Sequence, residues 1–299
     1  MRTVILGGGI MGGGIAIALA RAGHAVTVVE PQSAAADVLR SRLPAAAAGT
    51  RGAATPDVVH DLAVASEAEL VIEAAPEDLS LKLELWRRLG EIAPRHAILA
   101  TNTSSLDVDL LAECVPDPSR VLATHWFNPA YEIECVEVAP GRATDPSVLE
   151  RTLAVLRTAG KRPVVVRNRA GFVANRIQFA AIREALLCVE EGMPAHDVDE
   201  IVRTSFAPRL AALGPLANAD LGGLDTYLAI FEVLRAAHGE RFAPPDGLTA
   251  LVEAGRLGVK SGAGVAQYGA EEARALVRLR DARLSRIIAA SHEGGPDAQ

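Results

Sequence analysis

The sequence predicts an α/β protein in which a doubly wound, mainly parallel sheet is followed by an all-helical C-terminal domain. Short apolar runs alternate with helical patterns throughout the first half, which is the order of a parallel sheet with crossover helices. No convincing strand follows Val166, and one long helical pattern begins at Phe172. We therefore predict a sheet domain over residues 1–168, a helical domain over 169–293 and a disordered tail over 294–299.

The first strand–helix–strand unit has a glycine-rich turn at its first junction. The apolar run Thr3–Leu6 predicts a buried strand, the small residues of Gly12–Gly23 predict a helix, and Ala25–Val29 predicts the next strand. The turn reads Gly-Gly-Gly-Ile-Met-Gly over residues 7–12, which matches the fingerprint of dinucleotide-binding proteins in its required setting. The N-terminal domain is therefore predicted to be of the Rossmann type.

Each part of this turn has a physical role in binding a cofactor. Gly7 makes the tight turn, Gly9 lets the backbone approach a pyrophosphate, and Gly12 allows close packing of helix and strand. The pyrophosphate would lie at the helix N-terminus, whose free amides favour anions. Glu30 follows the second strand and would bind the ribose hydroxyls, which favours NAD over NADP because Pro31–Gln32 offers no arginine. The predicted contacts of NAD are Gly7, Gly9, Ile10, Met11, Gly12 and Glu30.

The remaining elements follow from the same apolar patterns. The further predicted strands are Leu70–Glu73, Ile98–Thr101, Val121–His125, Cys135–Val138 and Val164–Arg167. Helices are predicted in the sheet domain over Ser33–Leu43 and Leu79–Ile92, with an alanine-rich loop over 45–54. The predicted helices of the C-terminal domain are Phe172–Glu191, Val198–Thr204, Leu224–Ala237, Gly247–Ala254 and Ala270–Ala290.

The composition is that of an ordinary globular protein. The 299 residues are 49% hydrophobic and 22% charged, and the net charge of −7 argues against a nucleic-acid partner. Cys114, Cys135 and Cys188 lack the spacing of metal ligands, so we expect free thiols, a reducing compartment and no metal site. Neither a leader before the first strand nor a membrane-spanning apolar stretch is recognisable, so we expect a cytoplasmic protein without membrane contact.

Four polar residues fall where an open α/β sheet presents side chains to a ligand. His125 ends a buried strand, and Glu137 lies in the next strand, where its carboxylate could orient the imidazole as in a catalytic triad. Ser104 follows another strand, and Asn175 lies in the first turns of the helical domain. Oxidation of an alcohol by a nicotinamide cofactor needs such a base and such donors. Taken singly, each of these residues also has a purely structural explanation, such as a turn cap for the serine.

Taken together, these residues and their surroundings resemble the short-chain L-3-hydroxyacyl-CoA dehydrogenases over essentially the whole chain. The resemblance rests on Glu30 and on the segments GGGIMG (7–12), VIEAAPEDLSLK (71–82), TNTSSL (101–106), HWFNP (125–129), CVEV (135–138), GKRPVVV (160–166) and GFVANR (171–176). It continues through EALLCVEEG (184–192), LGPLANADLGGLD (213–225) and LGVKSGAG (257–264). The segments agree with the family in both order and spacing.

The resemblance implies an NAD-dependent dehydrogenase of a 3-hydroxyacyl group. It implies that His125 takes the proton of the 3-hydroxyl and that Glu137 orients His125. Ser104 and Asn175 fall on the positions that hold the substrate oxygen and the histidine in place. Further cofactor contacts are implied at Glu77, Lys82, Asn102 and Asn128. A homodimer is also implied, in agreement with helical apolar faces that one cleft cannot bury.

Two departures from the family bear on the substrate. The acyl carrier is expected to be CoA or an acyl-carrier protein. The stretch between Glu30 and Val71 is shorter than the helical excursion that contacts the CoA nucleotide in the family, which weakens the case for free CoA and favours the carrier protein. Residues 130–135 are more polar than in acyl-CoA enzymes and resemble relatives that act on carnitine or sugar acids. The alternative function is therefore a dehydrogenase of a free small 3-hydroxy acid.

Two further changes have no functional interpretation from the sequence. Ala170 replaces a customary proline, and Gly264–Ala266 replaces a Gly-Phe-Tyr signature. A non-catalytic NAD-binding protein is a third possibility, since one branch of the family serves as a lens protein. The presence of Ser104, His125, Glu137 and Asn175 argues against it.

Overall fold

The computed structural model describes residues 1–47 and 54–293, so the predicted tail (294–299) and most of the predicted loop (45–54) lie outside the described residues. Contacts divide the chain into two compact units, Met1–Ala181 and Ile182–Gln299. This division lies inside a helix, whereas the sequence places the domain boundary after residue 168, which stays a prediction.

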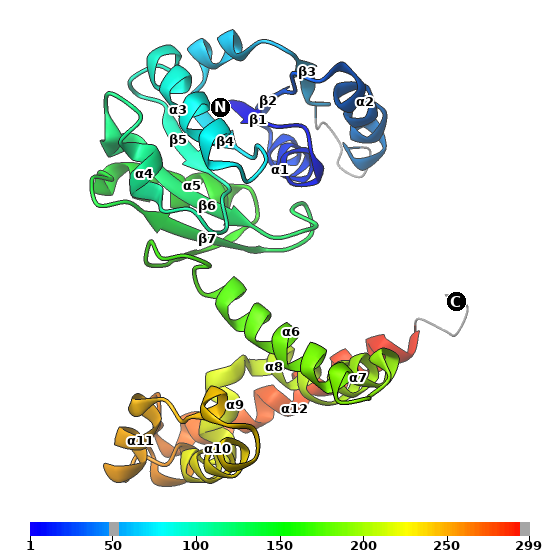
Figure 1. The fold of residues 1–299 in the computed structure, drawn as a ribbon, viewed down its shortest axis with the longest axis vertical. Helices are drawn as coiled ribbons and strands as arrows, with labels where there is room; N and C mark the ends of the chain where they lie inside the picture. Colours follow the sequence, from blue (N-terminus) through cyan, green and yellow to red (C-terminus); the bar gives the residue numbers. More distant parts are fainter. Residues whose placement is uncertain (48–53, 294–299) are drawn as a thin grey trace. The chain divides into compact units, whose positions relative to one another are not determined.

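The first unit is built on one eight-stranded sheet in the order β3-β2-β1-β4-β5-β6-β7-β8 (Figure 1). Its strands are β1 (Arg2–Leu6), β2 (Ala25–Val29), β3 (Asp57–Val59), β4 (Leu70–Glu73), β5 (Ile98–Thr101), β6 (Val121–Trp126), β7 (Cys135–Pro140) and β8 (Arg162–Val165). Neighbouring strands are parallel except β6 and β7. The chain starts at the centre and extends the sheet to both sides, which confirms the predicted doubly wound, mainly parallel topology.

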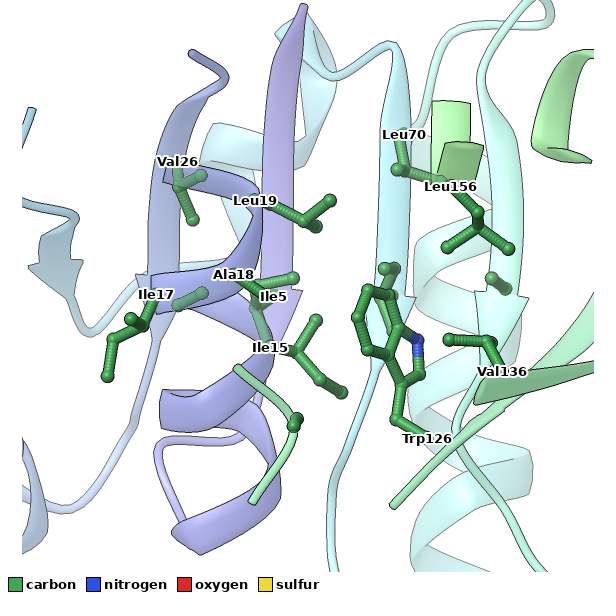
Figure 2. Close-up of a cluster of buried hydrophobic side chains, with 14 of the residues drawn as sticks. Ile5, Ile15, Ile17, Ala18, Leu19, Val26, Leu70, Trp126, Val136 and Leu156 are labelled. Carbon is green, nitrogen blue, oxygen red and sulfur yellow. The ribbon is translucent and has the colours of Figure 1, made fainter. Parts of the chain in front are cut away.

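Helices cover both faces of this sheet. One buried cluster joins it to α1 (Ile10–Arg21), α2 (Ser33–Ala47) and α5 (Pro146–Thr158), and Figure 2 shows Ile5, Ile15 and Trp126 within that cluster. A second cluster joins the other face to η1 (Leu62–Glu67), α3 (Leu79–Ile92) and α4 (Val108–Ala112). A short turn, η2 (Pro118–Arg120), precedes β6. Successive residues of β1 alternate between the clusters, as the pleat requires.

The sequence analysis missed β3, α4 and α5 and displaced some boundaries. β3 has only three residues, too few for a recognisable pattern. α5 carries a signal that was overlooked, because Asp145 caps it by accepting from the backbone N–H of Ser147 at 2.7 Å and Pro146 opens it. The predicted loop from residue 45 is wrong for 45–47, which continue α2. β8 begins earlier than predicted and includes Pro163, which an edge strand tolerates.

The second unit is helical, and α6 runs into it from the first. Its helices are α6 (Ala174–Glu190), α7 (Ala195–Ile201), α8 (Ala207–Leu213), α9 (Pro215–Gly222), α10 (Leu224–His238), α11 (Asp246–Glu253) and α12 (Ala270–Glu293), with short turns η4 (Glu240–Phe242) and η5 (Val259–Ser261). The described residues add only isolated bridges at Gly258, Ala263 and Gln267, so the predicted helical C-terminal domain is confirmed. None of the helices in the described part of the chain has the length and apolarity to span a membrane.

The helix predicted over Val198–Thr204 does not end there. α7 passes through a π-helical turn, η3 (Val202–Phe206), into α8. The backbone N–H of Ala207 donates to the carbonyl of Val202, five residues back. Pro208 follows and has no N–H to donate, so the ordinary helical ladder is interrupted at this position. α9 was missed because its small residues give no amphipathic pattern.

Two segments of the helical unit that matched the family meet at a buried carboxylate. Asp220 is 1% exposed and accepts hydrogen bonds from the backbone N–H of Val265 at 2.9 Å, that of Ala266 at 3.0 Å and the hydroxyl of Tyr268 at 2.7 Å. Burial and the bond to Asp220 raise the pKa of Tyr268 to about 12, so the phenol keeps the proton that it donates. A side chain at Gly264 would place its Cβ 2.0 Å from the Asp220 carboxylate. The altered Gly264–Ala266 segment therefore has a structural role.

Asp220→Ala is expected to destabilise the helical unit. The change leaves the backbone N–H groups of Val265 and Ala266 and the hydroxyl of Tyr268 without their buried acceptor, which costs roughly 2–4 kcal/mol in the free energy of unfolding. Thermal unfolding followed by circular dichroism measures the shift. Asp225→Ala, which removes the exposed partner of Lys260, is the control and should change the midpoint little. An unchanged midpoint for Asp220→Ala would contradict the role given to this carboxylate.

Candidate active site

Most of the polar residues singled out in the sequence line one cavity of about 350 Å³ in the first unit, beyond the carboxyl ends of β4, β5 and β6. Its lining comprises Met11, Ala74, Ala75, Glu77, Lys82, Asn102, Ser104, His125, Trp126, Phe127, Asn128 and Asn175. Glu137 lies outside this lining, while Gly7, Gly9, Ile10, Gly12 and Glu30 belong to the neighbouring glycine turn and its surroundings. The predicted residues thus form one continuous region.

The register of β6 and β7 pairs His125 directly with Glu137. Nδ1 of His125 lies 2.8 Å from Oε2 of Glu137, and both side chains are buried. With Nδ1 as the donor, the carboxylate fixes the tautomer whose Nε2 carries a free lone pair. This is the arrangement of a general base with an orienting carboxylate.

The second oxygen of Glu137 binds the backbone where α6 begins. Oε1 accepts from the N–H of Val173 at 3.0 Å and from that of Ala174 at 2.9 Å. These amides belong to the helix N-terminus, which favours a negative charge. One carboxylate therefore holds both the imidazole and the first turn of the helix that carries Asn175.

Two aromatic rings enclose the imidazole. The ring centroid of Phe127 lies 4.7 Å from that of His125, and the centroid of Phe172 lies at 5.5 Å. Phe172 is buried although its φ is +44°, a conformation that non-glycine residues rarely adopt. The preceding Gly171 has φ of +73° and donates its N–H to the carbonyl of Ser104 at 3.1 Å. The residues before α6 thus contact the site twice: Gly171 is hydrogen-bonded to Ser104, and Phe172 packs against the ring of His125.

Ser104 and Asn175 reach the cavity with side chains that have no hydrogen bond to other described residues. Both are therefore free to bind a ligand oxygen. Asn102 is partly engaged, because its Oδ1 accepts the backbone N–H of Trp126 at 2.9 Å. Its amide nitrogen remains available as a donor.

A buried ion pair missed by the sequence analysis lies beside the cavity. Nζ of Lys82 is 2.6 Å from Oε1 of Glu73, and neither side chain is more than 1% exposed. Glu77 is the second acidic partner, at 3.2 Å from the same nitrogen. Burial works to raise the pKa of Glu77, but hydrogen bonds from Thr103 and Ser105 and the charge of Lys82 outweigh it and hold the pKa below its usual value. Glu73 itself was the available signal in the sequence, because a charged side chain inside a buried strand requires a partner.

The glycine turn meets the steric demands of a dinucleotide. A Cβ at Gly12 would lie 1.9 Å from the carbonyl oxygen of Gly7, and one at Gly7, where φ is +108°, would lie 2.6 Å from that of Ala74. A Cβ at Gly9 would meet no atom within 4 Å, which leaves open space where the pyrophosphate approaches the backbone. The space around the three positions is therefore compatible with the roles that the fingerprint predicts for them and with a bound dinucleotide.

Glu30 stands beside this turn at a second cavity of about 400 Å³. Its Oε2 accepts from the N–H of Gly8 at 2.8 Å and its Oε1 from that of Gln32 at 3.0 Å, so the carboxylate is fixed in place. His60, whose Nδ1 is 2.8 Å from the carbonyl of Glu30, and Arg88 also line this cavity. The sequence analysis missed both, because β3 was not recognised and Arg88 looks like an ordinary surface residue of α3.

Glu30→Ala is expected to weaken NAD binding by about 10- to 100-fold, since hydrogen bonds between a carboxylate and hydroxyls contribute roughly 1.5–3 kcal/mol. Titration calorimetry with NAD and with NADP checks this. NADP should lose much less, because the repulsion of its 2′-phosphate is removed at the same time. Equal losses for both cofactors would point to a collapsed glycine turn instead of a lost ribose contact.

The Rossmann-type sheet, the glycine turn and Glu30 together define an NAD-dependent oxidoreductase. Two family models match the chain, that of the NAD-binding domain of 3-hydroxyacyl-CoA dehydrogenase over residues 2–169 and that of its C-terminal domain over residues 171–268. The chain therefore belongs to the 3-hydroxyacyl-CoA dehydrogenase family, whose enzymes act on CH–OH groups.

The similar proteins include enzymes named for a CoA thioester and one named for a pyridine carboxylate. A probable 3-hydroxybutyryl-CoA dehydrogenase of Bacillus subtilis is 36% identical over 89% of this chain and 97% of its own length. A 5-formyl-3-hydroxy-2-methylpyridine 4-carboxylate 5-dehydrogenase of Mesorhizobium japonicum is 33% identical over 94% of each. Among solved structures, a 3-hydroxyacyl-CoA dehydrogenase of Archaeoglobus fulgidus superposes with a TM-score of 0.80, at 32% identity over 97% of this chain and 98% of its own.

Proposed function

We propose that the protein oxidises the 3-hydroxyl of a 3-hydroxyacyl thioester, or reduces the corresponding 3-oxoacyl thioester, with His125 as the acid–base group. The observation that carries this proposal is the buried pair of His125 and Glu137 beside a cavity that Ser104 and Asn175 also line. These groups are a base, its orienting carboxylate and two donors for an alkoxide.

The chemistry follows from the hydrogen bonds of the pair. Because Nδ1 of His125 is bound to Glu137, Nε2 accepts the hydroxyl proton. Glu137 stabilises the imidazolium that forms, and in reduction the same nitrogen returns the proton to the alkoxide. The hydroxyl of Ser104 and the amide of Asn175 donate to the substrate oxygen. The glycine turn and Glu30 would hold NAD, which would accept the hydride that C3 of the substrate loses in the oxidation.

The charge of the cavity lining favours a thioester over a free acid. Lys82 is the one lysine or arginine among the described residues that line it. Its ammonium is already bound to Glu73 and Glu77. A free carboxylate would find no available permanent cation in this lining, whereas a thioester needs none.

The carrier of the acyl group is proposed to be CoA or an acyl-carrier protein. α2 ends at Ala47 and β3 begins at Asp57, so little chain is left there for an arm that would bind the nucleotide of CoA. A phosphopantetheine arm on a carrier protein needs no adenine pocket. The shortened stretch therefore supports the carrier-protein form of the substrate.

A dehydrogenase of a free small hydroxy acid is the second candidate. The Mesorhizobium relative is named for a pyridine carboxylate, which is not a thioester. Residues 130–135, the polar segment of the sequence, are tied down by Lys161, whose Nζ donates to the carbonyls of Ala130 at 2.7 Å and Ile133 at 2.8 Å. Burial lowers the pKa of Lys161, with Glu132 and Glu134 opposing it. Lys161 therefore fixes two points of this segment, and a role of the segment in substrate selection is part of this second proposal.

Initial rates of NADH oxidation with four matched substrates decide between these candidates. They are acetoacetyl-CoA, a short acetoacetyl-pantetheine thioester, acetoacetyl-carrier protein and free acetoacetate. Turnover of the thioesters in preference to the free acid supports the first proposal. Equal rates with acetoacetyl-CoA and with acetoacetyl-carrier protein would contradict the preference for a carrier protein. Turnover of acetoacetate alone selects the second candidate, and NADH binding without turnover of any substrate would leave a non-catalytic protein.

A homodimer is proposed from the exposed apolar side chains of α6. None of its residues is buried, and Ile177, Phe179 and Leu186 are each more than half exposed. A helix with this much exposed apolar surface is typical of an interface. Light scattering at micromolar concentration tests the proposal, and the mass of a single chain would overturn it.

The cytoplasm is the proposed location. All three cysteines are free thiols in the structure, including Cys135 at the start of β7. Free thiols persist where the redox balance is reducing. Fractionation of cells that express a tagged chain tests this, and recovery from an oxidising compartment would contradict it.

A further inference from the structure

The cavity beside Glu30 has apolar walls as well as polar groups. It lies at the carboxyl ends of β1 and β2 and is also lined by the segment after β3, the loop after β4 and one face of α3. Leu62, Leu81 and Leu85 are among its lining residues, and Leu81 is 44% exposed, so its side chain is open to contact. Adenine is the part of NAD with two apolar faces, and it follows the ribose that Glu30 is predicted to bind. The cavity is therefore suited to this base.

The short strand β3 ends next to Glu30 and binds the backbone of that residue on both sides. The N–H of Glu30 donates to the carbonyl of Val59 at 2.9 Å, and the carbonyl of Glu30 lies 2.8 Å from Nδ1 of His60. β3 pairs with β2 over three residues, so these bonds extend the contact beyond the last paired residues. His60 is thereby placed in the lining of the cavity.

The bond to Glu30 determines which nitrogen of His60 carries the proton. A carbonyl oxygen only accepts hydrogen bonds, so Nδ1 is the donor. In the neutral ring Nε2 is then an acceptor with a free lone pair. The side chain of His60 is exposed, so this lone pair is open to a ligand in the cavity.

Two carboxylates that also line the cavity are held differently. Asp61 is turned toward η1, where its Oδ1 accepts the backbone N–H of Ala63 at 2.9 Å and caps the turn. Glu84 is exposed on α3 and forms no hydrogen bond or ion pair with the other described residues. His60 differs from both, because the protein fixes one ring nitrogen as a donor and leaves the other as an acceptor facing a ligand.

The edge of adenine matches such an acceptor. Its C6 carries an amino group, which donates hydrogen bonds, whereas hypoxanthine has a carbonyl oxygen at the same position and can only accept there. A neutral imidazole whose Nδ1 is bound to Glu30 can accept the amino N–H but cannot donate to the carbonyl oxygen. The two bases are otherwise similar in size and shape.

We propose that His60 is a specificity-determining residue for the base of the cofactor, which accepts the amino N–H of adenine at Nε2 while Nδ1 is bound to Glu30. A cofactor with a carbonyl oxygen in place of that amino group is disfavoured. This role concerns the cofactor and does not depend on the identity of the substrate, so it can fail or hold separately from the proposed function.

The test measures the dissociation constants of NADH and of reduced nicotinamide hypoxanthine dinucleotide from the fluorescence of the reduced nicotinamide. It is run at pH 8, where a free imidazole is neutral. His60→Asn keeps a donor for the carbonyl of Glu30 and removes the acceptor, whereas His60→Gln offers an oxygen acceptor in place of Nε2. His196→Gln is the matched control, because it alters an exposed histidine beside Asp197 in the second unit.

The wild type is expected to bind NADH about tenfold more tightly than the hypoxanthine analogue, which is the effect of about one hydrogen bond that the analogue cannot form. In His60→Asn this ratio should fall below about twofold because NADH binds more weakly, while the analogue is nearly unaffected. His60→Gln should retain a ratio of about three- to fivefold, and His196→Gln should change neither constant.

Glu30→Ala distinguishes reading of the base from support of the turn. It should weaken both cofactors by the same factor and keep the ratio near tenfold, because the ribose is common to both. If His60 only supported Glu30, the variants of His60 would behave in the same way as Glu30→Ala. The ratio of the two dissociation constants is therefore the quantity that a merely structural role would not change.

Several results would overturn the proposal. Equal binding of both cofactors by the wild type would show that the base edge is not read. A ratio that persists in His60→Asn but is lost in Asp61→Asn or Glu84→Gln would assign the recognition to a carboxylate. If His60→Asn does not fold, His60→Leu, which has no polar side-chain atom, must lose the ratio, and a ratio kept near tenfold would be contrary to the role of His60.

Discussion

Replacing His125 with glutamine is expected to lower the turnover of acetoacetyl thioesters by about 10²–10⁴-fold, the usual contribution of a positioned general acid or base. The imidazole of His125 lines the cavity, and its Nδ1 is bound to the buried carboxylate of Glu137. Glutamine keeps much of the volume between Phe127 and Phe172 but cannot transfer a proton at neutral pH. NADH oxidation measured at saturating substrate gives the change in kcat.

Two further measurements make this result specific. NADH binding should be unchanged in His125→Gln, since the glycine turn and Glu30 lie apart from the imidazole. His96→Gln alters an exposed histidine just before the amino end of β5, whereas the cavity lies beyond the carboxyl end of that strand, so it should retain full turnover. Normal turnover in His125→Gln would exclude the imidazole as the acid–base group, whatever the substrate.

Glu137→Gln is expected to lower turnover by a similar factor, about 10²–10⁴-fold, for a different reason. An amide can still accept the N–H groups of Val173 and Ala174 with its oxygen, but it then presents its own NH₂ to Nδ1 of His125. That contact favours the tautomer with the proton on Nε2, which cannot accept the hydroxyl proton. The rate of the catalytic step, measured in a single turnover, checks this expectation.

Glu137→Ala separates the two roles of this carboxylate. It removes the acceptor of the helix amides as well as the partner of the imidazole, so it should also lower the unfolding midpoint, whereas Glu137→Gln should lower it less. If turnover falls in Glu137→Ala but not in Glu137→Gln, the carboxylate serves only to bind the backbone amides of Val173 and Ala174. The orienting role would then be wrong.

The sequence predicted those parts of the fold that have strong local signals. The first strand–helix–strand unit combines an apolar run, a glycine turn and an acid after the second strand, and each of these has one structural explanation. β3 and α9 have no such signal, because one has three residues and the other consists of small residues without an apolar face. Long-range packing decides their structure, so local patterns could not reveal them.

The site was predicted only as far as single residues with known chemistry. The cavity brings together Ser104, His125 and Asn175, while the roles of Glu73 and Lys161 depend on contacts between distant segments. One compositional signal pointed to those contacts. Among many arginines the chain has three lysines, and Lys82, Lys161 and Lys260 each place a compact ammonium 2.6–2.7 Å from an oxygen acceptor. Lysine presents its charge at a single nitrogen, so two of these three residues, Lys82 and Lys161, are buried at sites with acceptors close to that one atom.

The bonds between Glu137 and the first turn of α6 have a consequence for exchanging domains among relatives. The model of the NAD-binding domain ends at residue 169 and that of the C-terminal domain begins at residue 171, so a chimera of two relatives would ordinarily be joined between them. The amides of Val173 and Ala174 would then come from a different parent than the carboxylate they bind. Chimeras joined at that point would take His125 and Glu137 from one parent and the helix turn that Glu137 binds from the other. A junction placed beyond Asn175 would keep the complete constellation in one inherited piece.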